Sequence, residues 1–258
     1  MTYTDRRTEL WTRFTVWLAR LRTGGAGGGR LVGVERDTLV NSLNNGRPAQ
    51  RWLAAEALGE GDPGRDGVHA LIEALGSDDP ILRAEAGNAL AHNNGRAVRG
   101  ALLETAAAND PVMQAAAADA LGQMPADEAT AAALQAMLDS PHAVVRQSAA
   151  EALAHMGWPP LHKSAEPRPD PAPRLLALLA GDPDLMVRRA AALALGKLGD
   201  PAARDALVAC QDDPTEDRRV REAAALAVTR LPAMHPADPP KEVALGTEEP
   251  SAAESSTG

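Results

Sequence analysis

One short apolar pattern recurs six times along the chain at a nearly constant interval. The copies are RWLAAEALG (51–59), RAEAGNALA (83–91), QAAAADALG (114–122), RQSAAEALA (146–154), RRAAALALG (188–196) and REAAALAVT (221–229). Their equivalent apolar anchors are spaced by 32, 31, 32, 42 and 33 residues, and they are Leu58, Leu90, Leu121, Leu153, Leu195 and Val228. A fixed period of this length indicates a chain built from stacked supersecondary units.

Each repeat contains two segments with helical periodicity, joined by a short turn. In the segment 67–75, Val68, Leu71, Ile72 and Leu75 fall on one face of a helix. The turns between segments contain Asp, Ser and Pro, as in SDDP, ANDP and GDPD. Asp and Ser cap a following helix, and Pro is accepted in its first turn. No strand pattern is present in the sequence, which therefore predicts an all-α fold, an α-solenoid of about six helical hairpins.

The second segment of each repeat is rich in alanine, which favours close stacking. A single hairpin cannot bury its apolar face alone, so each must pack on its neighbours. Small side chains allow helix axes to approach to the short end of about 8–10 Å. The position after each anchor holds a small residue, as expected for a tight crossing: Gly59, Ala91, Gly122, Ala154, Gly196 and Thr229.

Composition and charge exclude several classes of function. The net charge of −9 argues against a general nucleic-acid or anionic-membrane binder. The single cysteine, Cys210, excludes an internal disulfide framework and suits a reducing compartment. No apolar run approaches the about 20 residues that span a bilayer, and the N-terminus lacks a continuous signal-peptide core. We expect a monomeric cytoplasmic protein that does not bind nucleic acid.

The pattern DP…VR…AA…ALG…LGD, clearest in residues 182–200, resembles that of HEAT-repeat proteins. The resemblance is particularly to the short repeats of the phycobilin-lyase HEAT-like class, which are armadillo-like solenoids. The resemblance covers about residues 35–231. The third repeat has Gln114 where others carry arginine, and the first has Arg47-Pro48 where others carry Asp-Pro. HEAT arrays serve many purposes, so the resemblance predicts the fold much better than the activity.

The resemblance also assigns a structural role to the repeated arginines. In HEAT families an Asp–Arg ladder fixes neighbouring repeats, and Asp182 is expected to pair with Arg188. The ladder is favoured over a phosphate-binding row, because each arginine follows a turn with an acid or a cap residue. The arginines are Arg51, Arg83, Arg146, Arg188 and Arg221.

Segments outside the repeats differ in composition and give the expected organisation of the chain. The expected units are an amphipathic N-terminal helix (1–23), a glycine-rich tether (24–34), repeats one to four (35–156), a proline-rich insertion (157–173), repeats five and six (174–231) and a disordered acidic tail (232–258). The insertion contains six prolines and cannot continue a helix. It is either a linker between two sub-arrays or a loop that reaches over the concave surface.

The N-terminal segment combines an apolar stripe with positive charge. Leu10, Phe14, Trp17 and Leu21 lie on one stripe of the predicted helix, and Trp11 widens it. The segment and its tether carry six arginines against two acids. Three roles remain open for this docking helix: a cap on the first repeat, a contact with another protein, or attachment to a membrane surface.

Candidate binding residues are sought on the second helices, which the HEAT resemblance places on the concave surface. Residues at equivalent positions form columns there, acidic and polar in repeats one to four and more basic and apolar in repeats five and six. This gradient suits a protein partner with a basic region. The candidate partner-binding residues are Trp52, Glu56, Asn88, His92, Asp119, Glu151, His155 and Arg189.

No catalytic, metal or cofactor constellation is found in the sequence. Deoxyhypusine hydroxylase, also built from HEAT repeats, binds di-iron through His-Glu pairs, and this chain contains no His-Glu dipeptide. His92 and His155 occupy equivalent positions two repeats apart, at about 20 Å, which is too far to share a metal ion. Aromatic residues make up 2% of the chain, which leaves little to stack on a bilin. HEAT-like DNA glycosylases need a basic, aromatic-lined groove, whereas this surface is acidic.

These observations predict a non-catalytic HEAT-repeat scaffold or adaptor that binds a protein partner on its concave surface. One alternative is a phycobilin-lyase-like protein, or another HEAT protein that handles a small ligand or cofactor. The other alternative is a peripheral membrane or partner-docking adaptor that acts through the N-terminal helix.

Overall fold

The computed structural model describes residues 30–156 and 170–232, with the backbone alone for 30–35. The expected N-terminal helix with Trp11, Phe14, Trp17 and Leu21, most of the insertion and almost all of the tail lie outside these residues. The described helices are α2 (Arg30–Asn45), α3 (Pro48–Glu60), α4 (Gly64–Leu75), α5 (Pro80–His92), α6 (Arg96–Ala106), α7 (Pro111–Gly122), α8 (Glu128–Met137), α9 (Ala143–His155), α10 (Ala172–Gly181), α11 (Leu185–Leu198), the 3-10 turn η2 (Pro201–Ala203), α12 (Arg204–Asp212) and α13 (Arg218–Arg230).

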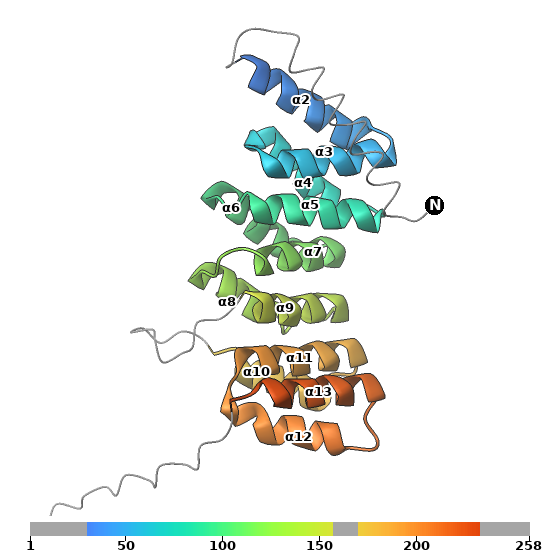
Figure 1. Cartoon of the computed structure of the whole chain (residues 1–258), viewed down its shortest axis with the longest axis vertical. Coiled ribbons are helices and arrows are strands. Elements are labelled where there is room, and N and C mark those ends of the chain that lie inside the picture. Colours follow the sequence, from blue (N-terminus) through green and yellow to red (C-terminus); the bar gives the residue numbers. More distant parts are fainter. Residues whose placement is uncertain (1–29, 157–169, 233–258) are drawn as a thin grey trace, which may run out of the picture.

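These helices form six hairpins that stack along one axis (Figure 1). The hairpins are α2–α3, α4–α5, α6–α7, α8–α9, α10–α11 and α12–α13. The second helices of successive hairpins pack on one another, while most first helices contact each other little. The side made by α3, α5, α7, α9, α11 and α13 is called the inner face below, and the opposite side the outer face. The predicted all-α solenoid of six hairpins is confirmed.

Two expected boundaries shift. Helix α2 begins at Arg30, so residues 30–34 are helical and do not belong to the glycine tether. The single Gly33 in this stretch lowers helix stability by only about 1 kcal/mol and does not stop the helix. Helix α10 begins at Ala172, so the last two residues of the expected insertion, 172 and 173, are helical, with Pro173 in the first turn. Helices α9 and α11 pack directly, so the stack is continuous across the insertion.

Aspartates in the turns fix where the second helices begin. The carboxylates of Asp79, Asp110 and Asp184 each accept hydrogen bonds from two backbone N–H groups of the helix that follows. Pro80 and Pro111 occupy first-turn positions, where a missing N–H costs no hydrogen bond. The turn composition therefore explains the regular helix starts. Among the described helices, none is long and apolar enough to cross a bilayer.

The first-turn arginine of the second helix has a shared role in several repeats. Its side chain donates to the backbone carbonyl six residues earlier, at the end of the preceding helix. The bonds are Arg83 to Ser77 (2.6 Å), Arg146 to Ser140 (2.8 Å) and Arg188 to Asp182 (2.7 Å), and Gln114 replaces arginine with a bond to Ala108 (2.7 Å). These bonds satisfy carbonyls that a helix end leaves without a partner.

The carboxylate partners of these arginines come from the next hairpin. Arg146 makes two hydrogen bonds to the carboxylate of Asp182, at 2.7 and 2.9 Å, and Arg188 makes two to Glu216, at 2.9 and 2.8 Å. The expected carboxylate pairing of Asp182 with Arg188 is therefore wrong. Burial alone would raise the pKa of Asp182, but the hydrogen bonds from Arg146 and a backbone N–H lower it below its usual value. The carboxylate bonds of these arginines thus join successive hairpins, while their bonds to backbone carbonyls close the turn of their own hairpin.

Close contacts between second helices depend on glycine at alternate junctions. A Cβ atom placed on the glycine would lie within 2.9 Å of the facing alanine, and the pairs are Gly59 with Ala89, Gly122 with Ala152 and Gly196 with Ala227. At Gly122 the nearest atom is the Cα of Ala152, at 2.5 Å, which cannot move aside as a flexible side chain could. Adding a methyl group must therefore push the helices apart.

We expect Gly122→Ala to lower the free energy of unfolding by about 1–3 kcal/mol, because overpacking strains the α7–α9 crossing. The matched control is Gly100→Ala in α6, where a new Cβ has no neighbour within 4 Å. That change should raise stability by about 0.5–1 kcal/mol through helix propensity. Urea unfolding of both variants checks the pair. Equal effects at the two glycines would contradict the close-crossing account.

Candidate functional site

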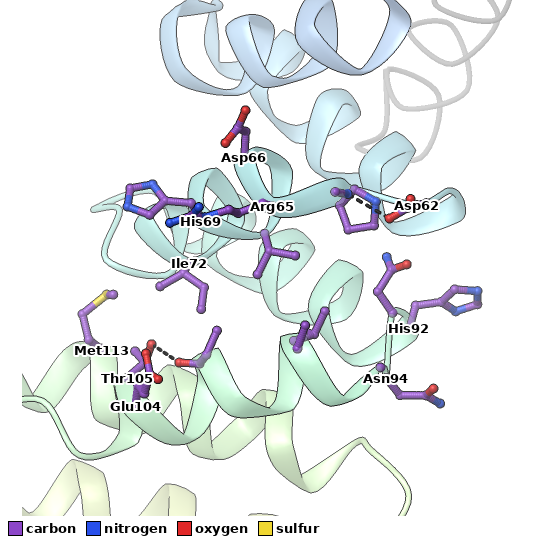
Figure 2. Close-up of a pocket in the computed structure, with 18 of the residues that line it drawn as sticks. Asp62, Arg65, Asp66, His69, Ile72, His92, Asn94, Glu104, Thr105 and Met113 are labelled. Carbon is purple, nitrogen blue, oxygen red and sulfur yellow. Dashed lines mark hydrogen bonds between the residues drawn. The ribbon is translucent and has the colours of Figure 1, made fainter. Parts of the chain in front are cut away.

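Two hollows flank the junction between the second and third hairpins. At this junction α5 and α7 contact each other less than other neighbouring second helices do. The inner groove, about 770 Å³, lies over α5, α7 and α9 on the inner face. The outer groove, about 1300 Å³, lies on the outer face between α4 and α6 and is drawn in Figure 2. The inner groove is the candidate binding site because it gathers polar side chains from three repeats.

The inner groove changes character along its second helices. Near the helix starts it is lined by Val112 and Val144, each 48% exposed. About two to three turns further on it is lined by Asp119, Glu151 and His155. Equivalent positions of successive repeats align because the second helices run in the same direction. The groove therefore offers an apolar end and an acidic centre to a single bound segment.

Asp119 is the electrostatic centre of the inner groove. The neighbouring groove walls partly desolvate the carboxylate and raise the pKa of Asp119 to about 6, although the residue as a whole is exposed to solvent. The negative charge of Glu151 raises the pKa further, while a hydrogen bond with Ser148 and the charge of His155 act in the opposite direction. The groove therefore holds two neighbouring acidic side chains, Asp119 and Glu151.

Hydrogen bonds along α9 set the orientation of the other polar groups. Gln147 donates through Nε2 to Oε1 of Glu151 at 3.1 Å. His155 Nδ1 lies 2.9 Å from the backbone carbonyl of Glu151. A carbonyl only accepts, so Nδ1 carries the hydrogen and Nε2 remains available for a ligand. The carboxylate and the imidazole are thus held by their own helix.

The structure brings four of the eight candidate residues together. Asn88, Asp119, Glu151 and His155 line the inner groove, on α5, α7 and α9. His92, although equivalent to His155 in the repeat, lines the outer groove instead. Within the described part of the chain, no group of three or more His, Cys, Asp or Glu residues is arranged to hold a metal ion.

The remaining three candidates lie away from the inner groove. Trp52 is half-buried and donates through Nε1 to Oδ2 of Asp79 at 2.6 Å, which ties α3 to the start of α5. Trp52 therefore has a structural role at the first junction. Glu56 on α3 and Arg189 on α11 are half-buried and are not among the residues lining the groove.

Sequence reasoning missed the apolar end of the groove. It considered polar columns near the anchor residues, whereas Val112 and Val144 stand at the starts of α7 and α9. The sequence does contain a sign of this apolar end. Two successive repeats have a valine at the start of the second helix, a position that is usually exposed to solvent. Ser148, which is 8% exposed and hydrogen-bonded with Asp119, was also missed.

Aromatic side chains are absent from both grooves in the described residues, where Trp52 is the sole Phe, Tyr or Trp. A groove of this composition has no Phe, Tyr or Trp ring on which a planar ligand could stack, and its only planar rings are the imidazoles of His155 in the inner groove and of His69 and His92 in the outer groove. The inner groove offers instead carboxylates, amides, small aliphatic groups and the His155 imidazole, together with the Arg83 guanidinium, which donates to the Ser77 carbonyl. Such a lining suits a peptide segment better than a chromophore.

A family model described as HEAT repeats matches residues 68–154 and 164–229, more than half of the chain. A search of curated proteins found no match. Among solved structures, one similar protein is an engineered protein, with 23% identity, 76% of this chain and 96% of that chain covered, and a TM-score of 0.47.

Two natural proteins of known structure are also similar. Human deoxyhypusine hydroxylase in complex with glycerol has 20% identity, and the match covers 89% of this chain and 91% of that chain with a TM-score of 0.36. The complex of CpcE and CpcF of phycocyanin lyase from Nostoc has 20% identity, and the match covers 76% of this chain and 94% of that chain with a TM-score of 0.34. Likenesses this distant supply no argument about activity.

We expect Asp119→Asn to stabilise the protein at pH 7. The folded-state pKa of about 6 exceeds the usual value near 3.9, so ionisation of Asp119 destabilises the folded state above pH 6. Since the side chain is partly solvated, the gain in unfolding free energy should be at most about 1 kcal/mol. Urea unfolding at several pH values measures it. The gain should vanish as the pH falls from 6 to below 4, and a loss at pH 7 would make Asp119 a structural residue.

Proposed function

The chain belongs to the HEAT-repeat family, and on that premise we propose that it is a non-catalytic scaffold that binds a basic segment of a protein partner in the inner groove. The observation that carries the proposal is the pair formed by Asp119 and Glu151. These carboxylates repel each other across α7 and α9, and partial desolvation by the groove walls already disfavours the charge on Asp119. A retained, unfavourable charge in a groove is a sign of a binding site.

A Lys or Arg side chain is the ligand that best matches this pair. Its positive charge would offset the repulsion between the carboxylates, and its N–H groups would donate to oxygens that only accept. Arginine suits the site well because its planar fork can reach both carboxylates at once. The proposal thus names the chemistry of the central contact: a charge-assisted hydrogen bond from the partner.

The apolar end of the groove suggests what flanks the basic side chain. Val112 and Val144 are exposed side by side in the repeat, and burying them would favour binding. The groove crosses three helices, or about 20 Å at ordinary helix spacing. An extended chain covers that distance with about six residues. The expected ligand is therefore a segment of about six residues with one basic and one or two aliphatic side chains.

We expect an array of hexapeptides probed with the full chain to select sequences that contain Lys or Arg near an aliphatic residue. Glu151→Lys should lower the affinity for these peptides at least about tenfold, because it replaces attraction by repulsion in the groove. The matched control is Glu222→Lys on α13, which makes the same charge change at an exposed site on the inner face, outside the groove. Affinities follow from fluorescence anisotropy with the selected peptides.

The pH dependence of binding gives a second arm of this experiment. A cationic peptide binds the ionised form of Asp119, so affinity should fall about tenfold from pH 7 to pH 5, below the pKa of about 6. Asp119→Asn should bind weakly at both values and lose this dependence. The proposal is wrong if Glu151→Lys and Glu222→Lys bind the selected peptides equally well, or if selection ignores basic residues.

A further inference from the structure

The outer groove is a separate surface that the proposed function does not use. Figure 2 shows Asp62, His92 and Asn94 at one end and Glu104, Thr105 and Met113 at the other. The groove runs along α4 and α6, which lie on the outer face. Its volume of about 1300 Å³ exceeds that of most small-ligand pockets, about 300–1000 Å³. It has room for a peptide helix.

The floor of the outer groove is apolar. Val68 and Ile72 of α4 and Ala101 of α6 are half-buried, and each lines the groove. Met113 reaches over Gly76, with its sulfur 2.9 Å from the place where a Cβ would stand. Methionine adapts readily to a docked partner because its side chain is unbranched and flexible. The floor thus presents aliphatic side chains that a second apolar stripe could cover.

The groove and the N-terminal stripe have matching lengths. Helix α4 has 12 residues and α6 has 11, which correspond to about 16–18 Å. The stripe from Leu10 to Leu21 in the predicted N-terminal helix also extends for about 16 Å. The apolar floor of the groove and the apolar stripe of the predicted helix are therefore about equally long.

The start of α2 lies near the Asp62 end of the outer groove, so the N-terminal segment that precedes it can reach that end. Helix α2 begins at Arg30, and Arg36 on this helix donates through Nε to the carbonyl of Asp62 at 3.1 Å and through Nη2 to its carboxylate at 3.3 Å. Arg30 is about 9 Å further along the α2 axis. The six residues 24–29 can extend for about 20 Å. The tether is long enough to bring Leu21 to the Asp62 end.

The charges at the rim complement the basic segment. Asp66 and Glu104 lie at the groove, and Asp62 is held by Arg36. Arg65 is the other positive side chain of the rim. Residues 1–29, the N-terminal segment with its tether, carry five arginines and two acids. Attraction at the rim is modest, so the apolar floor supplies most of the contact.

We propose that residues 8–22 of this chain form a helix that docks in the outer groove of the same molecule. The helix runs antiparallel to α4 and α6, with Leu21 near Asp62 and Leu10 near Met113. Phe14 and Trp17 cover the floor between them. The inner groove stays open in this arrangement, so the docked helix leaves the proposed partner-binding site accessible.

Hydrogen exchange of the full chain, followed by mass spectrometry, tests this docking. Trp17→Asp should speed amide exchange in α4 and α6 about tenfold, because loss of the docked helix exposes the outer groove. Exchange in α11 and α13, far along the stack, should not change. The matched control is Thr12→Asp, which adds the same charge on the opposite side of the predicted helix and should leave exchange in α4 and α6 as in the wild type.

Two other results of the hydrogen-exchange experiment would overturn docking of residues 8–22 in the outer groove. Protection of α4 and α6 that rises with protein concentration would assign the groove to a second copy and overturn docking within one molecule. Equal exchange in the wild type and Trp17→Asp would leave residues 8–22 outside the groove and overturn the proposal. Since both substitutions lie outside the six hairpins, neither result depends on a damaged solenoid. Failure here would also leave the peptide-binding proposal for the inner groove intact.

Discussion

The contact between a glycine on one second helix and an alanine on the next sets how the hairpins stack. It brings backbone against backbone at Gly59, Gly122 and Gly196, so the inner face is tightly spaced while most first helices contact each other little. The junctions without glycine depend on other contacts. The fourth and fifth hairpins are joined by Arg146 and Asp182, whereas Arg83 of the second hairpin donates to the turn of its own hairpin.

The grooves follow from this uneven stacking. Both lie beside the second–third junction, where α5 and α7 make fewer contacts than their counterparts elsewhere. The inner groove places Asp119 among walls that raise its pKa, and Glu151 stands beside it. A solenoid selected only for stability would have a neutral side chain at Asp119. The charge supports the proposed binding of a basic segment in the inner groove, and the apolar floor of the outer groove supports the proposed docking of the chain's own N-terminal segment.

Much of the fold could be predicted from the sequence, because the repeat period and the turn residues are local signals. The six hairpins, the capping aspartates and the close approach at Gly122 all follow from residues near one another in the chain. The grooves could not be predicted in the same way, since they depend on the spacing at a single junction. Likewise, the sequence predicts Trp52 as a partner-binding residue, whereas its hydrogen bond to Asp79 places it between two hairpins.

The same distinction explains the errors. Asp182 lies six residues before Arg188, which suggested a local pair, but its carboxylate faces Arg146 from the previous hairpin. Residues 30–34 follow a run of glycines, yet they belong to α2 because only one glycine remains among them. For Asp182 the residues nearby in the sequence suggested one partner, but the residue packed against it in three dimensions is another. For residues 30–34 the preceding glycines suggested a tether, but the residues themselves form the start of α2.

The most direct measurement is an NMR titration of the Asp119 side-chain carboxyl in the full chain, with and without N-acetyl-arginine amide as a minimal cationic ligand. The account predicts a pKa near 6 in the free protein, which falls toward the usual range near 4 as the guanidinium occupies the groove. A pKa that is already ordinary in the free protein, or one that stays near 6 at saturating ligand, would contradict the claim that this carboxylate is held ready for a positive charge.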